Sequence, residues 1–180
     1  NRYRDKVKTP EEAVRLVKSG DKVVVSMLLH PTAICMALAK RKDELKQVTL
    51  LSHWQDDFPW FQDGWEDSFQ IQSGFILRPT REGHRANKFE FIPSVFGLNN
   101  GTRHKEYLRG KIYPDADVFI FKVTPPNEHG WCSFGHSVWY SYVAAKSAKT
   151  VIAEVDPNLI WTCGQHIHVS DLDWLVEGPQ

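Results

Sequence analysis

The sequence predicts an α/β domain, a layered fold in which helices flank a mainly parallel sheet. Short apolar runs typical of buried strands occupy residues 21–26, 48–51, 116–123 and 150–155. Helical patterns separate the first run from the second and the third from the fourth. This alternation is the spacing of βαβ units, which join parallel strands by right-handed crossovers.

The first helix has clear start signals. Thr9 is expected to cap it, with Pro10 at its first position and Glu12 completing a capping box. The apolar stripe that follows ends before Ser19-Gly20, directly ahead of the first strand. Pro31 is expected to start the second helix, which leads into the second strand.

The rest of the chain is less regular. Residues 53–69 contain three tryptophans and five acids without a sustained period. We therefore expect them to run over the surface, with their aromatic side chains packed against the domain or a partner. Later elements are expected as a strand at 89–92, a helix at 138–148, a short strand at 166–169 and a helical or extended segment at 171–177. Gly178-Pro179 is then expected to mark a domain boundary.

The composition is that of a soluble globular domain of 180 residues. Basic and acidic residues number 22 each, so the chain has no general attraction for nucleic acid or anionic lipid. No apolar run approaches the roughly 20 residues that cross a bilayer, and the charged first residues do not resemble a signal peptide. The three cysteines are odd in number and far apart, which predicts reduced thiols and a cytoplasmic location.

Candidate site residues lie in loops after predicted strands, because sites in parallel sheets form at the carboxyl ends of the strands. His30 and Pro31 follow the first strand, where the histidine lies beside an anion at the helix start, caps the helix or fills a pocket. Residues 124–130 follow the third strand and contain two prolines. Their polar side chains either present an edge to a carboxylate or acyl group, or cap one another in a stiff turn.

Metal and nucleotide sites are not predicted. Cys163, His166 and His168 lie close in sequence, and His129 is near Cys132, but the chain has no CxxC pair and no HExxH motif. Glycine-rich phosphate loops and the GxSxG motif of α/β-hydrolases are also missing from the sequence.

Several motifs follow one another in a familiar order. DADVFIFKVTPPNEHGWCSFG holds a strand and a Pro-Pro-x-x-His-Gly loop, and a helix, the strand TVIAEV and the stretch HIHVSDLDWLVE follow. The opening KTPEEAVRLVKSGDKVVV, His30-Pro31 and the middle piece with Arg81, Gly83 and Phe91-Ile92-Pro93 fit the same order. Over nearly its whole length the chain resembles the acetyl-CoA hydrolase/transferase family, class I CoA-transferases of the 4-hydroxybutyrate and butyryl-CoA:acetate type.

The resemblance implies that residues 1–180 form the amino-terminal domain of a two-domain enzyme, itself part of a homo-oligomer. Such enzymes move CoA between an acyl-CoA and a free carboxylate through a glutamyl-CoA thioester. The nucleophilic glutamate belongs to the carboxy-terminal domain, so this chain is expected to contain no catalytic residue and to be inactive alone. Coenzyme A is implied as a substrate, with no permanently bound cofactor, and the carboxy-terminal domain is the implied partner.

The resemblance also implies which residues line the substrate cleft. These are His30, Pro31, Asn127, Glu128, His129 and Gly130, on the wall opposite the nucleophile. The chain departs from the usual family pattern at Thr124, Asn127, Asp156 and Ile160-Trp161. Asn127 removes a charge from the expected pocket, which leaves the choice of substrate open. Acyl-CoA hydrolysis on the same scaffold and a non-catalytic binding module, with residues 54–69 as its docking surface, are the alternatives.

Overall fold

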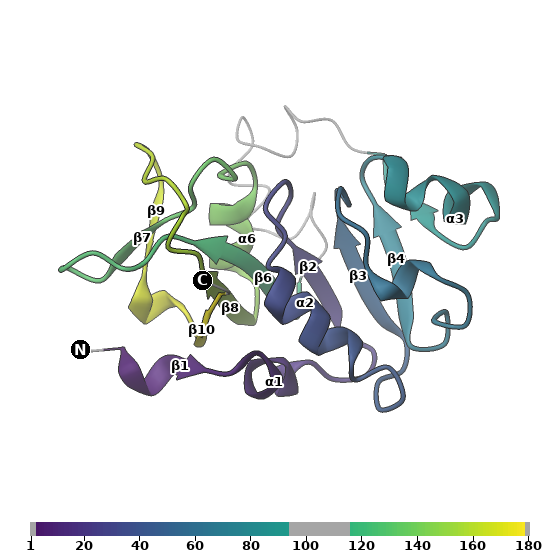
Figure 1. Ribbon diagram of the computed structural model, residues 1–180, viewed down its shortest axis with the longest axis horizontal. Coiled ribbons are helices and arrows are strands. Elements are labelled where there is room, and N and C mark those ends of the chain that lie inside the picture. Colours follow the sequence, from purple (N-terminus) through teal and green to yellow (C-terminus); the bar gives the residue numbers. More distant parts are fainter. Residues whose placement is uncertain (1–2, 94–115, 179–180) are drawn as a thin grey trace.

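In the computed structural model, which describes residues 3–93 and 116–178, eight strands form one sheet (Figure 1). The strand order is β1-β10-β8-β6-β2-β3-β4-β5, and every described pair is parallel. The prediction of an α/β fold with a mainly parallel sheet is confirmed. The strands are β1 Val7–Lys8, β2 Lys22–Val25, β3 Val48–Ser52, β4 Phe69–Ser73, β5 Glu90–Phe91, β6 Val118–Val123, β8 Thr150–Val155 and β10 Trp174–Glu177.

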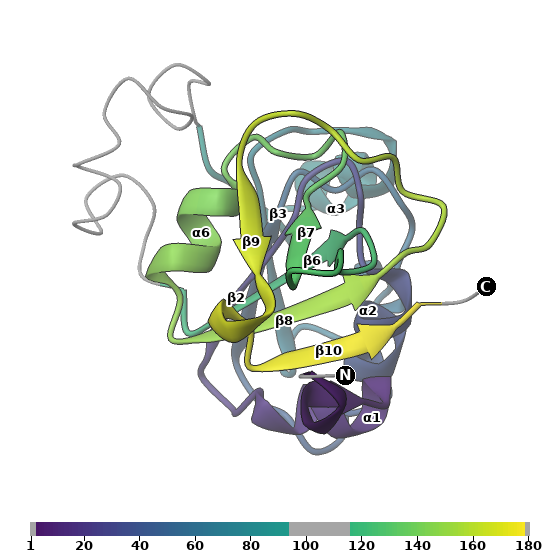
Figure 2. The ribbon, with the colours of Figure 1, turned by 90° about the vertical axis from the view of Figure 1, so that its left-hand side faces the viewer.

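Helices cover both faces of this sheet. The helices α1 (Pro10–Ala13) and α2 (Thr32–Ala39) lie on one face and α6 (Ser141–Ser147) on the other, as the side view in Figure 2 shows. A further short helix, α3 (Arg81–Arg85), lies near the β4–β5 end of the sheet (Figure 1). No helix among residues 3–93 and 116–178 has the length and apolar character to cross a membrane.

The chain starts α1 as the sequence predicts. The Thr9 hydroxyl accepts a hydrogen bond from the Glu12 backbone N–H, and the Glu12 carboxylate accepts one from the Thr9 N–H at 2.9 Å. This reciprocal pairing satisfies two donors that a helix start leaves free. The helix is shorter than expected, however, because the chain turns into a 3-10 segment at Val14–Leu16.

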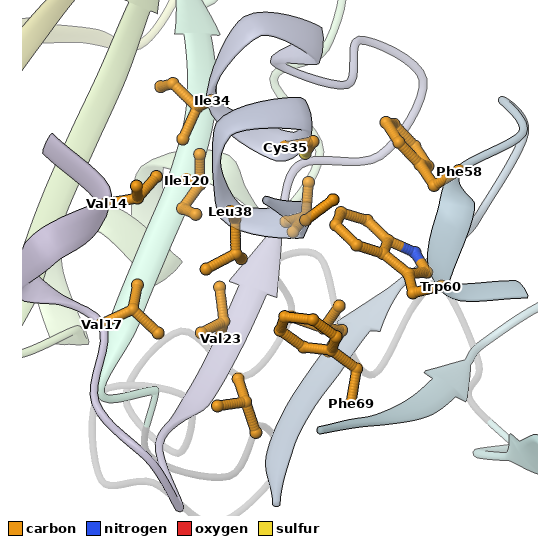
Figure 3. Packing of buried hydrophobic residues seen from close by; sticks show 14 of the residues in the cluster. Val14, Val17, Val23, Ile34, Cys35, Leu38, Phe58, Trp60, Phe69 and Ile120 are labelled. Carbon is orange, nitrogen blue, oxygen red and sulfur yellow. The ribbon is translucent and has the colours of Figure 1, made fainter. Parts of the chain in front are cut away.

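Each face of the sheet has its own apolar core. The core under α1 and α2 contains Ile34 and Leu38 from α2 and alternate residues of the central strands, such as Val23 and Ile120 (Figure 3). The core under α6 contains the opposite set, including Phe119. Period-2 alternation thus sends successive side chains of one strand into two cores.

The large rings of the aromatic segment after β3 lie inside the first core, so the expectation that they pack against the domain is confirmed, and they are buried more deeply than a run over the surface implies. Trp54 is fully buried, and Phe58 and Trp60 are exposed by 4% or less. Phe58 stacks on Trp60 with ring centroids 4.8 Å apart (Figure 3). The acids of the same segment remain at the surface. Because the composition of the segment includes these acids, it did not predict that the aromatic residues are buried.

Other differences concern short elements. The expected helix at 138–148 begins only at Ser141, because Trp139 has a φ of 27°, outside the helical region. The segment 171–177, expected to be helical or extended, contains β10, which pairs with β1 and β8. The expected strand at 166–169 is β9 (His166–His168), but it pairs antiparallel with β7 (Trp131–Ser133) in a separate small sheet.

Replacing Trp54 with alanine tests how much the aromatic segment contributes to stability. Removal of a fully buried indole leaves a cavity in the first core, so we expect the free energy of unfolding to fall by about 3–5 kcal/mol. Urea denaturation measures this change. Trp161→Ala is the matched control, since that side chain is 45% exposed and its loss should cost under about 1 kcal/mol. Equal losses in the two variants would contradict the assignment of Trp54 to the core.

Candidate functional site

His30 lies between β2 and α2, at the carboxyl edge of the sheet. Its side chain is fully buried, and both ring nitrogens have partners inside the domain. Nδ1 is 2.8 Å from an Asp56 carboxylate oxygen, and Nε2 is 3.3 Å from the Ser52 hydroxyl. Pro31 follows as the N-cap residue of α2. His30 therefore connects the ends of β2 and β3 and contacts the exposed Asp56.

The ring of His30 is held in place by aromatic side chains and is neutral. It stacks on Trp54 with centroids 5.4 Å apart, and Phe58 meets it edge-on. Burial lowers the pKa of His30, and the hydrogen bond to Asp56 opposes this only in part. A neutral imidazole beside a carboxylate carries its proton on the nitrogen facing that carboxylate. Nδ1 thus donates to Asp56, and Nε2 lies beside the Ser52 hydroxyl, which also donates to the Ser26 carbonyl.

A second histidine, His53, is buried next to this group. It is 3% exposed, and its ring lies 4.7 Å from Phe75 and 5.9 Å from Tyr140, centroid to centroid. The neighbouring Gly74 lets the chain pass closely, because a Cβ there would come within 2.4 Å of the His53 ring. Burial lowers the pKa of His53 to about 4, with a smaller contribution from His30.

Two charged residues inside predicted strands complete this edge. Lys122 of β6 and Glu154 of β8 are paired in register, and their charged groups lie 3.7 Å apart. Glu154 is fully buried and accepts a hydrogen bond from the Ile34 N–H at the start of α2. Burial raises the pKa of Glu154, although this N–H and Lys122 both favour its charged form. Sequence reasoning missed this pair, but a Lys and a Glu in otherwise apolar strands were a usable signal.

The loop after β6 forms a self-capped turn. The Asn127 side-chain oxygen accepts hydrogen bonds from the His129 and Trp131 N–H groups at 3.0 and 2.9 Å. Gly130 adopts a φ of 83°, and a Cβ there would lie 2.7 Å from the His168 ring. Glu128 and His129 extend into solvent, with 85% and 74% of their side chains exposed. The turn is held by its own hydrogen bonds, and the Glu128 and His129 side chains lie 3.3 Å apart at the surface.

The turn and His30 lie in different places within the described part of the chain. The two hollows that the turn lines are completed by Tyr3 and His168 in one case and by Trp131, Tyr142, Trp161 and His166 in the other, and neither includes His30. The strands that precede them, β2 and β6, are nevertheless neighbours in the sheet. Both loops thus leave the same edge of the sheet, one buried and one exposed.

The histidines of β9 make hydrogen bonds within the protein. His166 Nε2 lies 2.9 Å from the Thr162 carbonyl, and His168 contacts both the Ser170 hydroxyl and the His129 carbonyl. Cys163 is exposed. Within residues 3–93 and 116–178, no three histidine, cysteine or acidic side chains are grouped closely enough to hold a metal ion.

Comparison with known proteins assigns the family. The family model described as the acetyl-CoA hydrolase/transferase N-terminal domain matches residues 1–180. The chain belongs to this family. It is 32% identical over 180 residues to the 4-hydroxybutyrate coenzyme A transferase of Clostridium kluyveri, and 31% identical over 177 residues to the succinyl-CoA:cyclohexane-1-carboxylate CoA transferase of Geobacter metallireducens. These matches cover 97% of the chain but only 40% and 39% of the relatives.

Solved structures agree with the family and the fold. The chain matches the crystal structure of RipA from Yersinia pestis with a TM-score of 0.80 and 26% identity, over 97% of this chain and 42% of that one. It matches the 4-hydroxybutyrate CoA-transferase of Porphyromonas gingivalis with a TM-score of 0.68 and 25% identity, over 97% and 40%. The chain thus has the fold of an acetyl-CoA hydrolase/transferase amino-terminal domain and spans about two fifths of the relatives' length.

The buried His53 predicts a specific loss of stability in acid. Its pKa in the fold is about 4, against 6.5 when unfolded, so between these values the unfolded chain binds the extra proton. Stability should therefore decrease as the pH falls from 6.5 to 4, by about 3 kcal/mol in total from this group. In urea titrations across this range, His53→Gln should flatten the decrease. The exposed His136→Gln should keep the wild-type profile, and a wild-type profile in His53→Gln would contradict the prediction.

Proposed function

We propose that the chain is the amino-terminal part of an enzyme that transfers CoA between a short-chain acyl-CoA and a carboxylate. The observation that carries this proposal is the family match over residues 1–180, together with relatives named as CoA transferases. In the proposed reaction a glutamate outside this chain attacks the acyl-CoA thioester, which gives an acyl-glutamyl anhydride and releases the CoA thiolate. The thiolate then attacks the glutamyl carbonyl, which expels the acyl group as its free carboxylate and leaves a glutamyl-CoA thioester. The acceptor carboxylate then takes the CoA, which regenerates the free glutamate.

The proposed role of residues 1–180 is to form one wall of the substrate cleft. His30 and Pro31 follow β2, and the 127–130 turn follows the adjacent β6, so both loops lie at the carboxyl edge where sites form in parallel sheets. No residue is assigned as nucleophile, and we expect the chain to be inactive without its partner domain. CoA enters as a substrate, and a cytoplasmic homo-oligomer is the proposed setting, with the three free cysteines supporting a reducing compartment.

The partner that we propose is the carboxy-terminal domain of the same family. Ile160, Trp161 and Trp131 are large apolar side chains exposed by 63%, 45% and 44%. Trp131 and Trp161 line one hollow of 620 Å³ beside the 127–130 turn. Large exposed apolar residues gathered in this way are typical of an interface. The chain leaves the sheet near the same edge, where the Gly178 N–H donates to the Val155 carbonyl.

Trapping the intermediate tests the proposed reaction. The full-length protein, or this chain mixed with its partner domain, is incubated with acetyl-CoA and borohydride, and the intact mass and peptide map are recorded. We expect one reduced glutamate outside residues 1–180, because borohydride reduces a glutamyl thioester. No modification with several acyl-CoAs would remove the support for the covalent mechanism and favour a binding module.

Hydrolysis is the second candidate, since the family description includes both hydrolases and transferases. Acetate separates the two reactions. A transferase forms acetyl-CoA from another acyl-CoA when acetate is added, whereas a hydrolase releases free CoA at the same rate with or without it.

The exposed tryptophan face predicts how strongly the two parts associate. Trp161→Ser should weaken binding of the separately produced carboxy-terminal domain about tenfold or more, as expected for a central interface tryptophan. Isothermal titration calorimetry measures the dissociation constant. The control is His136→Ser, at another exposed position. Unchanged affinity in Trp161→Ser would place the interface elsewhere.

A further inference from the structure

Asp56 is an exposed carboxylate held by a buried ring. Its side chain is 59% exposed, whereas that of His30, which donates to it, is fully buried. It follows β3, and β3, β2 and β6 are consecutive in the sheet. Asp56 therefore lies at the edge that also carries the His30 loop and the 127–130 turn.

The orientation of the Asp56 carboxylate is fixed by the buried His30 ring. His30 cannot rotate, because Trp54 stacks on its ring, Phe58 packs edge-on and Ser52 occupies Nε2. The flanking Trp54 and Phe58 are themselves buried, so the backbone on both sides of Asp56 is anchored in the core. Most exposed aspartates change rotamer freely, but this one is oriented by a donor that has a single position.

The charge of Asp56 is not neutralised within the described part of the chain. Its only ion-pair partner there is His30, which is neutral, and no lysine or arginine of residues 3–93 and 116–178 pairs with it. Burial lowers the pKa of His30, so the ring does not supply a compensating positive charge near neutral pH. The neighbouring Asp57 is also exposed but forms no described hydrogen bond or ion pair.

We propose that Asp56 is a specificity-determining residue of the substrate cleft, which selects against acyl groups that carry a second carboxylate. This inference rests on the proposed CoA-transfer function and adds to it a class of preferred substrate, the uncharged acyl chain. A fixed negative charge repels a second carboxylate that comes close to it, and an uncharged chain avoids this cost. His30 acts as a positioning residue, because it aims the carboxylate without reaching the substrate itself.

The test compares two donors in the full-length enzyme. Values of kcat/KM for succinyl-CoA and butyryl-CoA, with acetate as acceptor, are measured for the wild type, Asp56→Asn and Asp57→Asn. Asp56→Asn should raise the succinyl-to-butyryl ratio about tenfold, since it removes the charge and keeps the shape. Asp57→Asn should leave the ratio unchanged. An unchanged ratio in Asp56→Asn, or an equal rise in both variants, would overturn the proposal.

Two further measurements distinguish an effect of His30 on the orientation of Asp56 from a general loss of protein stability. His30→Gln keeps the charge of Asp56 but frees its orientation, so the ratio should rise by less than in Asp56→Asn. Raising the salt concentration should increase the ratio in the wild type and leave Asp56→Asn unaffected, because salt screens an exposed charge. A salt response of equal size in Asp56→Asn would contradict the role of this charge, and a fold defect alone would not produce it.

Failure of the proposed function would be visible separately. If the wild type transfers no CoA from either donor, the reaction assignment fails, and binding of the two acyl-CoAs measured by calorimetry then decides the role of Asp56. Tighter binding of succinyl-CoA to Asp56→Asn than to the wild type, with butyryl-CoA unchanged, supports the proposal. Equal binding of succinyl-CoA to both proteins overturns it.

Discussion

A fully parallel sheet must be covered on both faces, and this requirement determines how the rest of the chain is arranged. Eight strands spaced about 4.8 Å apart form a sheet roughly 34 Å wide. A helix such as α2 is about 10 Å across and covers only two or three strands. The remaining area above β3 and β4 is covered by Trp54, Phe58 and Trp60, which join the same core as α2. The aromatic segment therefore covers the part of this face that α2 does not reach.

The carboxyl edge shows a second consequence of the parallel arrangement. Three adjacent strands, β8, β6 and β2, end beside the start of α2, where free N–H groups favour a negative charge. Glu154 places a carboxylate oxygen there from inside the sheet, with Lys122 3.7 Å away. Buried ion pairs of this kind add little net stability, because desolvation offsets their attraction. Their main effect here is to fix the helix start, and with it the loop that carries His30.

Much of the fold could be predicted from the sequence, since the apolar runs of β2, β3, β6 and β8 and the capping box at Thr9 and Glu12 are local signals. The strands that were missed have weak local signals. β4 alternates with glutamines, and β1 has two residues that become a strand only by pairing with β10. The site was less predictable still. Asp56 meets His30 across 26 residues, and Glu154 meets Ile34 across 120, contacts that only the folded chain creates.

In the loop after β3, residues that stabilise the fold lie within a few positions of residues that are free to contact a ligand. Trp54 and Phe58 are buried, whereas the three residues between them, Gln55, Asp56 and Asp57, face solvent. Substitutions at exposed positions between such anchors change the free energy of unfolding little. Evolution can therefore alter the charge and shape of this loop in single mutational steps, without passing through unstable intermediates. The same property makes these three positions a suitable place to begin a randomised library for altered acyl selectivity.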